Sequence, residues 1–260
     1  MHHMKYYVVD AFTDMPFKGN PAGVCIVEKE LDASVMQDIA SENNLSETAF
    51  LLRRDGYYDL RWFTPLTEID LCGHATLGSA YVVSNFVEPG ISEMRFETRS
   101  GTLNVTRADE LYTMDFPSRK PARSTVTPLM EKAIGRHVAE AYESRDLMLV
   151  VDGERQVREL AVDFELIGQL AAHAVIVTAR GDKADFVSRF FAPNVGVPED
   201  PVTGSAHSTL IPFWAERLDK CIMTAMQLSR RGGTVYCENC GDRVRISGKA
   251  VLYLQGEIFV

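Results

Sequence analysis

The chain has 260 residues, of which 46% are hydrophobic and 24% are charged. This is enough for one large or two modest domains with an apolar core. The net charge of −9 argues against nucleic-acid binding, because no basic stripe offsets the acidic excess. No apolar run approaches the roughly 18 residues of a membrane helix, no secretion signal is evident, and the five cysteines favour a reducing compartment. We therefore expect a cytoplasmic protein without a membrane span.

Strand-like runs recur along the whole chain, each bounded by turn residues. In chain order they are Lys5–Ala11, Gly23–Val27, Thr48–Leu52, Leu60–Phe63, Glu93–Thr98, Thr102–Thr106, Leu111–Phe116, Leu147–Val151, Ala174–Thr178, Thr234–Glu238, Arg243–Ser247 and Ala250–Gln255. Amphipathic helices are expected before two of these strands, in the segments Leu31–Arg54 and Val162–Arg180. The mixture indicates an α+β fold.

A longer pattern occurs twice, as RWFTPLTEIDLCGHATLGSAYVV from Arg61 and as RFFAPNVGVPEDPVTGSAHSTLIPFW from Arg189. In both copies an aromatic pair runs into a proline, an acidic loop, a small-residue turn and an apolar helical stretch. The two helix-strand segments upstream also align with each other. Halves of this size indicate a duplicated domain, since solenoid repeats have periods of about 20 to 50 residues. A pair of similar domains favours a ligand site in the cleft between them.

The turns Cys72-Gly73-His74 and Thr203-Gly204-Ser205 open the apolar helices of the two copies. The first amides of a helix lack intrahelical partners, and the helix dipole adds partial positive charge, so such a turn can hold a small anion. Glycine permits close approach because it has no Cβ. The alternative is that both are ordinary helix caps. The stretch after Gly73 has almost no polar face, which predicts a helix surrounded by protein and a sheet wrapped around it.

Five ordered motifs, DAFTDMPFKGNPAGV, NLSETAFL, DLCGHATLG, VPEDPVTGSAHSTL and RISGKAVLYLQGEI, resemble those of the PhzF family of phenazine-biosynthesis-like proteins. The resemblance runs nearly from end to end. It implies the fold of diaminopimelate epimerase: two pseudo-symmetric domains, each a barrel-like β-sheet around a central helix, with the active site between them and often a homodimer. The proline-rich segment 115–128 reads as the linker, which gives domains of 1–117, with 256–260 returning to it, and 118–255.

The same resemblance assigns roles to individual residues. It implies that Glu47 is the general acid/base, and that His74, Asp200 and Ser205 surround the reacting ligand. It also implies substrate contacts from three further positions, which are Asn20, Gly73 and Gly204.

The residues themselves agree in type with two of these roles. Glu47 stands between a helix and an apolar strand, where partial burial helps a carboxyl to hold a proton near neutrality. Asp200 lies close to a helix N-terminus, which keeps it ionised and suits it to orient His74 or the substrate. Without the resemblance, Glu47 reads as a surface or capping residue and His74 as a hydrogen-bonded residue of the helix start.

The two copies differ where the chemistry would lie. Cys72 of the first copy corresponds to Thr203 in the second, so an epimerase that uses two thiols is disfavoured. Glu47 likewise has no carboxylate counterpart, since His173 or Ala174 stands in its place. This favours a cofactor-independent isomerase in which one base moves one proton within a small carboxylate-bearing substrate. An epimerase or racemase of an amino acid or related acid is the first alternative, and a non-catalytic ligand-binding protein is the second.

Three further motifs carry less weight. No nucleotide-binding fingerprint is present, so no cofactor is expected. Cys237 and Cys240 have metal-ligand spacing, but the glycine and alternating strand that follow favour a hairpin turn, and no metal site is expected. His207 lies one turn into the second helix, where a structural role is more common than a catalytic one. The substrate is not identified by any of these patterns.

Overall fold

The structure, a computed structural model, describes residues 3–260. It divides into unit 1, Met1–Asp115 with Ser247–Val260, and unit 2, Phe116–Ile246. The first two residues of the predicted first domain lie outside the described residues. The return to unit 1 begins at Ser247, earlier than the predicted residue 256, because β18 (Ala250–Phe259) pairs antiparallel with β1 (His3–Ala11) along its length.

Unit 1 is built on a sheet with the strand order β18, β1, β2, β3, β4, β6, β7 and β8, with β5 paired on β4. After β1, its elements in chain order are β2 (Asn20–Val27), α1 (Ala33–Asn43), β3 (Glu47–Arg53), β4 (Tyr58–Phe63), β5 (Glu68–Ile69), α2 (Gly73–Val82), a π-helical turn (Val83–Val87), β6 (Glu93–Thr98), β7 (Gly101–Ala108) and β8 (Leu111–Pro117). Strand β8 runs across the boundary into unit 2.

Unit 2 has the strand order β9, β10, β11, β12, β13, β15 and β16, with β14 paired on β13. Its elements are β9 (Ala122–Ser124), α3 (Pro128–Ile134), β10 (Glu140–Glu143), β11 (Leu147–Val150), α4 (Glu154–Arg158), α5 (Phe164–Gln169), β12 (Val175–Arg180), β13 (Phe186–Ala192), a 3₁₀ turn (Pro193–Val195), β14 (Val197–Asp200), α6 (His207–Leu218), β15 (Ile222–Gln227), β16 (Gly233–Asn239) and β17 (Arg243–Gly248). The segment predicted as a linker contains β9 and ends at α3, so it is part of this unit's fold.

The two sheets have the same internal connectivity. In unit 1, β2 pairs parallel with β3, β3 antiparallel with β4, and β4 parallel with β6. In unit 2, β11, β12, β13 and β15 repeat that parallel, antiparallel, parallel sequence. The predicted duplication is therefore present at the level of strand pairing, and not only in the sequence.

Side-chain contacts repeat as well. Arg61 forms a two-pronged ion pair with Glu68, at 2.7 and 2.8 Å, and lies over the ring of Phe63. Arg189 pairs in the same way with Glu199, at 2.7 and 3.0 Å, and lies over the ring of Phe191. Glu199 therefore belongs to a structural ion pair that has an equivalent in unit 1. This pair accounts for one of the two acids in the repeated loop of unit 2.

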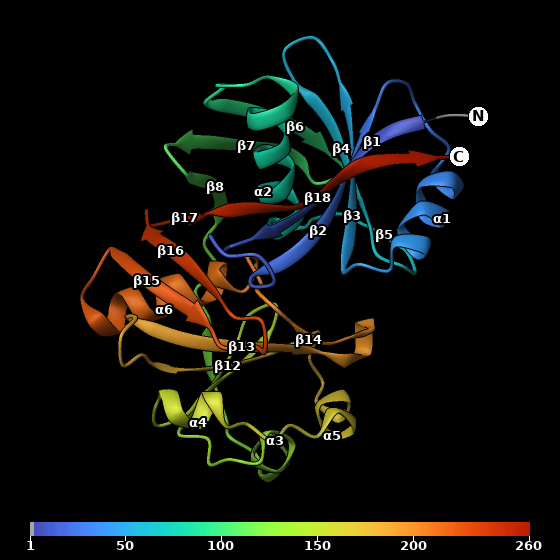
Figure 1. Cartoon of the computed structure of the whole chain (residues 1–260). Helices are drawn as coiled ribbons and strands as arrows, with labels where there is room; N and C mark the ends of the chain where they lie inside the picture. The colour runs from blue at the N-terminus through green and yellow to red at the C-terminus, as the bar shows by residue number, and fades with distance from the viewer. Residues whose placement is uncertain (1–2) are drawn as a thin grey trace. The chain divides into compact units, whose positions relative to one another are not determined.

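Helix α2 is the central helix of unit 1. Of its ten residues, all but Tyr81 are buried, and the helix packs against β1, β2 and β3. Figure 1 shows it (green) enclosed by the strands of this unit. A Cβ atom added to Gly78 would lie 3.6 Å from the side chains of Ala22 and Val9. A small residue at this position therefore lets the helix and the sheet approach closely. The predicted buried helix is confirmed.

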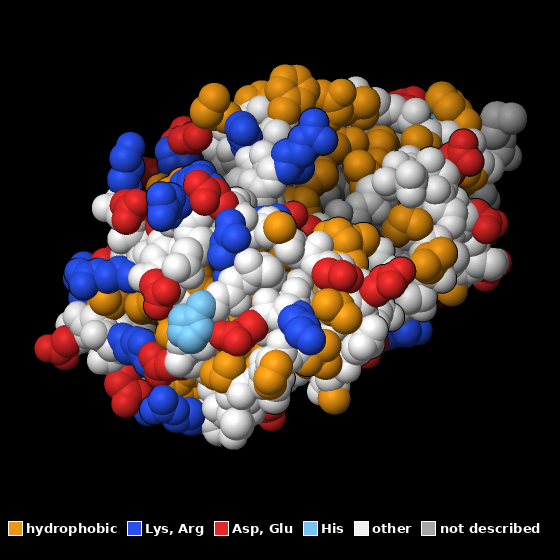
Figure 2. Space-filling view, turned by 90° about the horizontal axis from the view of Figure 1, so that it is seen from below, with side chains coloured by type: hydrophobic (Ala, Val, Ile, Leu, Met, Phe, Trp, Pro, Cys, Tyr) orange, Lys and Arg blue, Asp and Glu red, His pale blue; other side chains and the backbone are white. Residues whose placement is uncertain are grey.

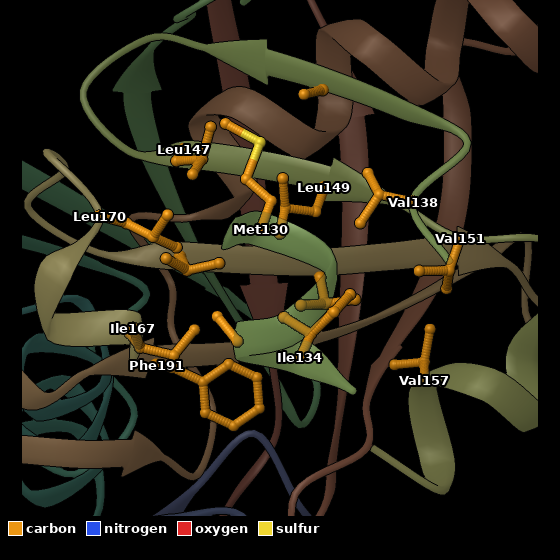
Figure 3. Close-up of a cluster of buried hydrophobic side chains, with 14 of the residues drawn as sticks. Met130, Ile134, Val138, Leu147, Leu149, Val151, Val157, Ile167, Leu170 and Phe191 are labelled. Carbon is orange, nitrogen blue, oxygen red and sulfur yellow. The ribbon is translucent and has the colours of Figure 1, made fainter. Parts of the chain in front are cut away.

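A separate apolar core lies between α3, α4 and α5 and the strands of unit 2. Met130 and Ile134 of α3 pack with Leu147 and Leu149 of β11 (Figure 3). The cap of α3 is well defined, since the Thr127 hydroxyl accepts a hydrogen bond from the Met130 amide and Pro128 follows at the first helical position. This core fixes the sheet that carries the second copy of the repeated turn.

The face seen in Figure 2 carries both signs of charge, with Lys and Arg side chains interspersed among Asp and Glu. Interspersed charges do not form the continuous basic stripe that nucleic-acid binding requires. Within residues 3–260, no helix has the length and apolar character needed to cross a membrane.

Candidate active site

Three predicted site residues of unit 1 are brought together by strand pairing. Asn20 begins β2 and Glu47 begins β3, and these parallel strands start at the same edge of the sheet, with Ala22 opposite Glu47. Helix α2 begins at Gly73 and carries His74 to the same edge. The geometry follows from topology, because parallel neighbours place their first residues side by side.

His74 is the centre of this cluster. Its Nε2 lies 3.0 Å from Oε2 of Glu47, and the two side chains are only 5% and 12% exposed. The approach is oblique, and neither atom has a hydrogen-bond partner of good geometry in the described part of the chain. On the other side of the ring, Nδ1 lies 3.1 Å from Nδ2 of Asn20 and 3.5 Å from Sγ of Cys72. One imidazole thus connects an amide, a thiol and a carboxylate.

The charges in the cluster favour a protonated imidazole. Burial by itself lowers the pKa of His74, but the Cys72 sulfur and the Glu47 carboxylate oppose this, and the pKa lies well above its ordinary value. Burial, followed by the charge of Glu47, raises the pKa of Cys72 to about 11, so the sulfur is a thiol at neutral pH. The carboxylate of Glu47 is therefore the group that sustains the imidazolium.

The corresponding turn of unit 2 is held by a different network. The hydroxyl of Thr203 donates to the carboxylate of Asp200, and the amide of Thr203 donates to Oε1 of Gln227 at 2.8 Å. Nε2 of Gln227 in turn donates to the carbonyl of Asp200 at 2.7 Å. Asp200 and Thr203 thereby fix the shape of the turn. Gln227 is buried and was not predicted from the sequence, where nothing distinguishes it from other strand residues.

Helix α6 begins later than predicted. It starts at His207, whereas Gly204 lies in the preceding turn, in which the amide of His207 donates to the Gly204 carbonyl at 3.0 Å. The amide of Ser208 donates to the Ser205 carbonyl in the same three-residue pattern. The tighter turn accounts for the difference, since bonds of this kind precede many helices. Gly73, by contrast, is the first residue of α2.

His207 is a buried structural residue. It has no exposed surface, and its Nδ1 donates to the Thr203 carbonyl at 2.9 Å. Burial lowers the pKa of His207 to about 4, so the ring is neutral at physiological pH. This agrees with the structural role predicted for it.

Strand register identifies the counterpart of Glu47. Thr48 pairs with Phe63 in unit 1, and Val175 pairs with Phe191, the equivalent aromatic residue, in unit 2. The residue before Thr48 is Glu47, and the residue before Val175 is Ala174, which is buried. Of the two counterparts considered from the sequence, the register selects Ala174, and unit 2 offers no carboxylate at this position.

Sequence reasoning also missed Arg145. Its Nη2 donates to Oγ of Ser205 at 3.4 Å, and two of its nitrogens bind the carboxylate of Asp146 at 3.1 Å each. The sequence did contain a signal for this residue. Ser144-Arg145 lies just before β11, in the same position relative to the repeat as Asn20-Pro21 at the start of β2. That turn falls outside the segments in which the repeat is easily seen by eye.

Two further features bear on ligands. Glu47, Cys72 and His74 offer ligand atoms that lie within 4.8 Å of one another, a set of the types that zinc uses. The expectation of no metal stays a prediction. A groove of about 400 Å³ elsewhere on unit 1 is lined by apolar residues and by Arg54, but this arginine is already paired with Glu30 and Asp59, and none of the cluster residues lines the groove.

The cysteine pair Cys237 and Cys240 stands at a turn between two strands. Cys237 is buried and Cys240 is exposed, and the amide of Cys240 donates to the carbonyl of Arg243 across a tight turn that contains Gly241. The predicted hairpin turn is confirmed.

The architecture of two similar α+β units is shared with solved epimerases. A hydroxyproline epimerase from Agrobacterium vitis matches with a TM-score of 0.65 over 98% of this chain and 92% of that chain, at 12% identity, which shows the fold alone. The predicted fold class, that of the diaminopimelate epimerase-like proteins, is confirmed.

The chain belongs to the family of phenazine biosynthesis-like proteins, which it matches over residues 9–256. A crystal structure of a PhzF-family phenazine biosynthesis protein from Enterococcus faecalis covers all of both chains at 47% identity, with a TM-score of 0.98. An uncharacterized isomerase of Pseudomonas aeruginosa is 49% identical over 97% of both chains. The family names and these relatives support an activity of the isomerase or epimerase type.

Proposed function

We propose that the protein is a cofactor-independent isomerase that moves a proton within a small carboxylate-bearing substrate, with Glu47 as the general acid/base. The observation that carries the proposal is the contact of 3.0 Å between Glu47 and His74, in a buried cluster that unit 2 does not repeat. A carboxylate that is held in place by a neighbouring imidazole can accept a proton from carbon and return it to another atom.

Each residue of the cluster has a distinct part in this mechanism. Glu47 takes the proton from the substrate and delivers it to another atom of the same molecule. His74 stabilises the carboxylate while it is charged, and Asn20 fixes the ring by its contact with Nδ1. Gly73 begins α2, whose first amides are suited to an oxyanion of the substrate.

We assign supporting roles to the predicted residues of unit 2. Asp200 holds the turn through Thr203, and Ser205 together with the amide that follows Gly204 contacts the anionic part of the substrate. We further propose that the protein is a cytoplasmic homodimer, in line with the family resemblance. The five cysteines, all within the described residues, are free thiols, which supports a reducing compartment.

An epimerase or racemase remains the second candidate, and one contact favours it. Sγ of Cys72 lies 3.5 Å from the imidazole of His74, whose positive charge would stabilise a thiolate at this position. Against it, the equivalent residue of unit 2 is Thr203, which is no thiol acid. A ligand-binding protein without turnover has no use for a buried carboxylate–imidazole pair.

The test is a screen of small carboxylates, including dihydro-aromatic acids and amino acids, followed by proton NMR in D₂O. Isomerisation is expected to move a double bond or a carbon-bound proton within the substrate without changing the configuration of a stereocentre. A mirror-image product, with deuterium at the inverted carbon, would establish the epimerase instead. Saturable binding with no chemical change in any bound acid would favour the binding protein.

A further inference from the structure

Arg145 lies in unit 2 at the place that Pro21 holds in unit 1. Gly23 pairs with Thr48, and Leu147 pairs with Val175, the equivalent of Thr48, so that the turn Ser144-Arg145 matches Asn20-Pro21. In unit 1, this turn contacts the third residue of the repeated motif, since Asn20 reaches His74. In unit 2 it does the same, since Arg145 reaches Ser205. Before its first parallel strand, unit 2 therefore has a cationic side chain in contact with the repeated turn, whereas unit 1 has an amide side chain in that role.

The hydrogen bonds of Arg145 leave one terminal nitrogen of its guanidinium, Nη1, available. Nε and Nη2 bind the two carboxylate oxygens of Asp146, and Nη2 also contacts Ser205. Nη1 forms no hydrogen bond to any residue that the structure describes. Asp146 is itself only 2% exposed, so it holds the guanidinium from the protein side. The two N–H groups of Nη1 are therefore the donors that remain for a carboxylate or another oxyanion.

A second arginine adds to the positive charge. Arg119 is half-buried, its backbone amide donates to the Ser208 carbonyl at 2.8 Å, and its side chain has no ion pair within the described residues. Burial, and then the charge of Arg145, lower the pKa of Arg119. Two arginines and one aspartate, Arg119, Arg145 and Asp146, together carry a net charge of about +1 in a chain of net charge −9.

We propose that Arg145 determines specificity by binding the carboxylate of the substrate through Nη1 of its guanidinium, with the hydroxyl of Ser205 as a second donor. This inference rests on the proposed function for the identity of the substrate, but not for the presence of an anion site. A neutral analogue in which an ester or amide replaces the carboxylate is then excluded, because the arginine pair would stay uncompensated.

Sulfate is a suitable probe, because it is a small divalent oxyanion that needs no catalysis. Isothermal titration of the full chain with sulfate, at ionic strength held constant with chloride, is expected to show saturable binding. Arg145→Gln should weaken this binding at least tenfold, and Arg145→Lys by less. Arg155→Gln, an exposed arginine on α4, is the matched control and should bind sulfate as the unmodified chain does.

Several outcomes would overturn the inference. Saturable binding that is equal in Arg145→Gln would place the anion elsewhere, and absence of saturable binding in the unmodified chain would remove the site. If Arg145→Gln fails to fold by circular dichroism, Ser205→Ala serves instead, and an unchanged affinity in that variant would then count against the proposal.

The variant Glu47→Gln separates this inference from the proposed function. It should lose turnover and still bind sulfate with normal affinity. Once a substrate is known, Arg145→Gln should raise KM at least tenfold with a smaller change in kcat, as expected for a residue that binds ground state and transition state alike. A fall in kcat alone, with KM unchanged, would contradict the binding role.

Discussion

Each unit contains one buried histidine beside its repeated turn, and the two behave in opposite ways. His74 and His207 are 4% and 0% exposed. The pKa of His74 is raised, in spite of burial, by the sulfur and carboxylate around it, whereas that of His207 is lowered to about 4 by burial, with only a backbone carbonyl on its Nδ1. Burial is common to both, so the neighbours decide which histidine can carry charge.

This contrast shows how a duplicated fold assigns different work to its halves. Unit 1 has Glu47 where unit 2 has Ala174, and Cys72 where unit 2 has Thr203. Unit 2 holds the shape of its turn with hydrogen bonds among Asp200, Thr203 and Gln227, and has a cation nearby at Arg145. These differences support the two proposals, proton transfer by Glu47 in unit 1 and anion binding by Arg145 in unit 2.

The largest effect is expected for Glu47→Gln. The amide keeps the size of the side chain but cannot take a proton, so turnover should fall by roughly a hundredfold to ten-thousandfold while ligand affinity stays within about tenfold. Steady-state rates and titration with the same substrate measure the two quantities. The exposed Glu42→Gln on α1 is the control. Equal loss of binding and rate would make Glu47 a positioning residue.

His207 should make the protein sensitive to acid. Its folded pKa of about 4 lies below the unfolded value of 6.5, so the unfolded chain takes up a proton first as the pH falls. The stabilisation that comes from a neutral His207 is complete above pH 6.5. It is lost as the pH falls from 6.5 to about 4, and the free energy of unfolding then decreases by about 3 kcal/mol in total. His74 has the opposite sign, since its raised pKa stabilises the fold at low pH and the effect is lost as the pH rises.

Urea titrations of His207→Asn between pH 4 and 7 check this expectation. The free energy of unfolding of the variant should vary less steeply with pH than that of the unmodified chain. Parallel curves for the two proteins would show that another group causes the acid sensitivity.

A smaller effect is expected for Cys72→Ser. The thiol is buried, its pKa of about 11 keeps it protonated, and Glu47 already supplies the base, so the rate should fall less than about tenfold. A catalytic thiol would cost about a hundredfold or more. The exposed Cys221→Ser is the control. Rapid inactivation by a thiol reagent would support the epimerase mechanism if ligand protects the protein and the Cys72→Ser variant is not inactivated.

The smallest effect is expected for Gly204→Ala. Gly204 is not one of the described residues that have a positive φ, so the added Cβ should strain the backbone little. It would hold an anion away from the turn amides and weaken sulfate binding a few-fold, with little change in Tm. Gly153→Ala, where an added Cβ meets no atom within 4 Å, is the control. A loss of Tm without a change in affinity would make the glycine purely structural.

Much of the fold could be predicted, because apolar periodicity is a local signal. Every strand-like run of the sequence overlaps a strand, with only the end residues Val151 and Ala174 outside, and the buried α2 was evident from its lack of a polar face. Short elements such as α4 and β10 were not predicted, since five or four residues are too few to show a period. The start of α6 was placed three residues early, because the same small residues form a tight turn as readily as a first helical turn.

The site could be predicted only where motif and topology coincide. Glu47 and His74 came from the family resemblance, and parallel pairing of β2 and β3 then explains why they meet. Arg145 and Gln227 carry no motif, and their contacts with Ser205 and Thr203 arise from strand register, which a single sequence does not reveal. Roles that depend on contacts between distant segments need the structure.

The pairing of β1 with β18 also has a consequence for the order of folding during synthesis. The sequence of unit 2 is almost contiguous, so it is complete when the ribosome has finished residue 246. Unit 1 begins first and still lacks an edge strand at that moment. Its sheet must close a loop that contains the whole of unit 2, and long-range pairings of this kind form slowly. The half that carries Glu47 and His74 is therefore expected to mature last, and a nascent chain can hold a folded unit 2 before the sheet around these two residues is complete.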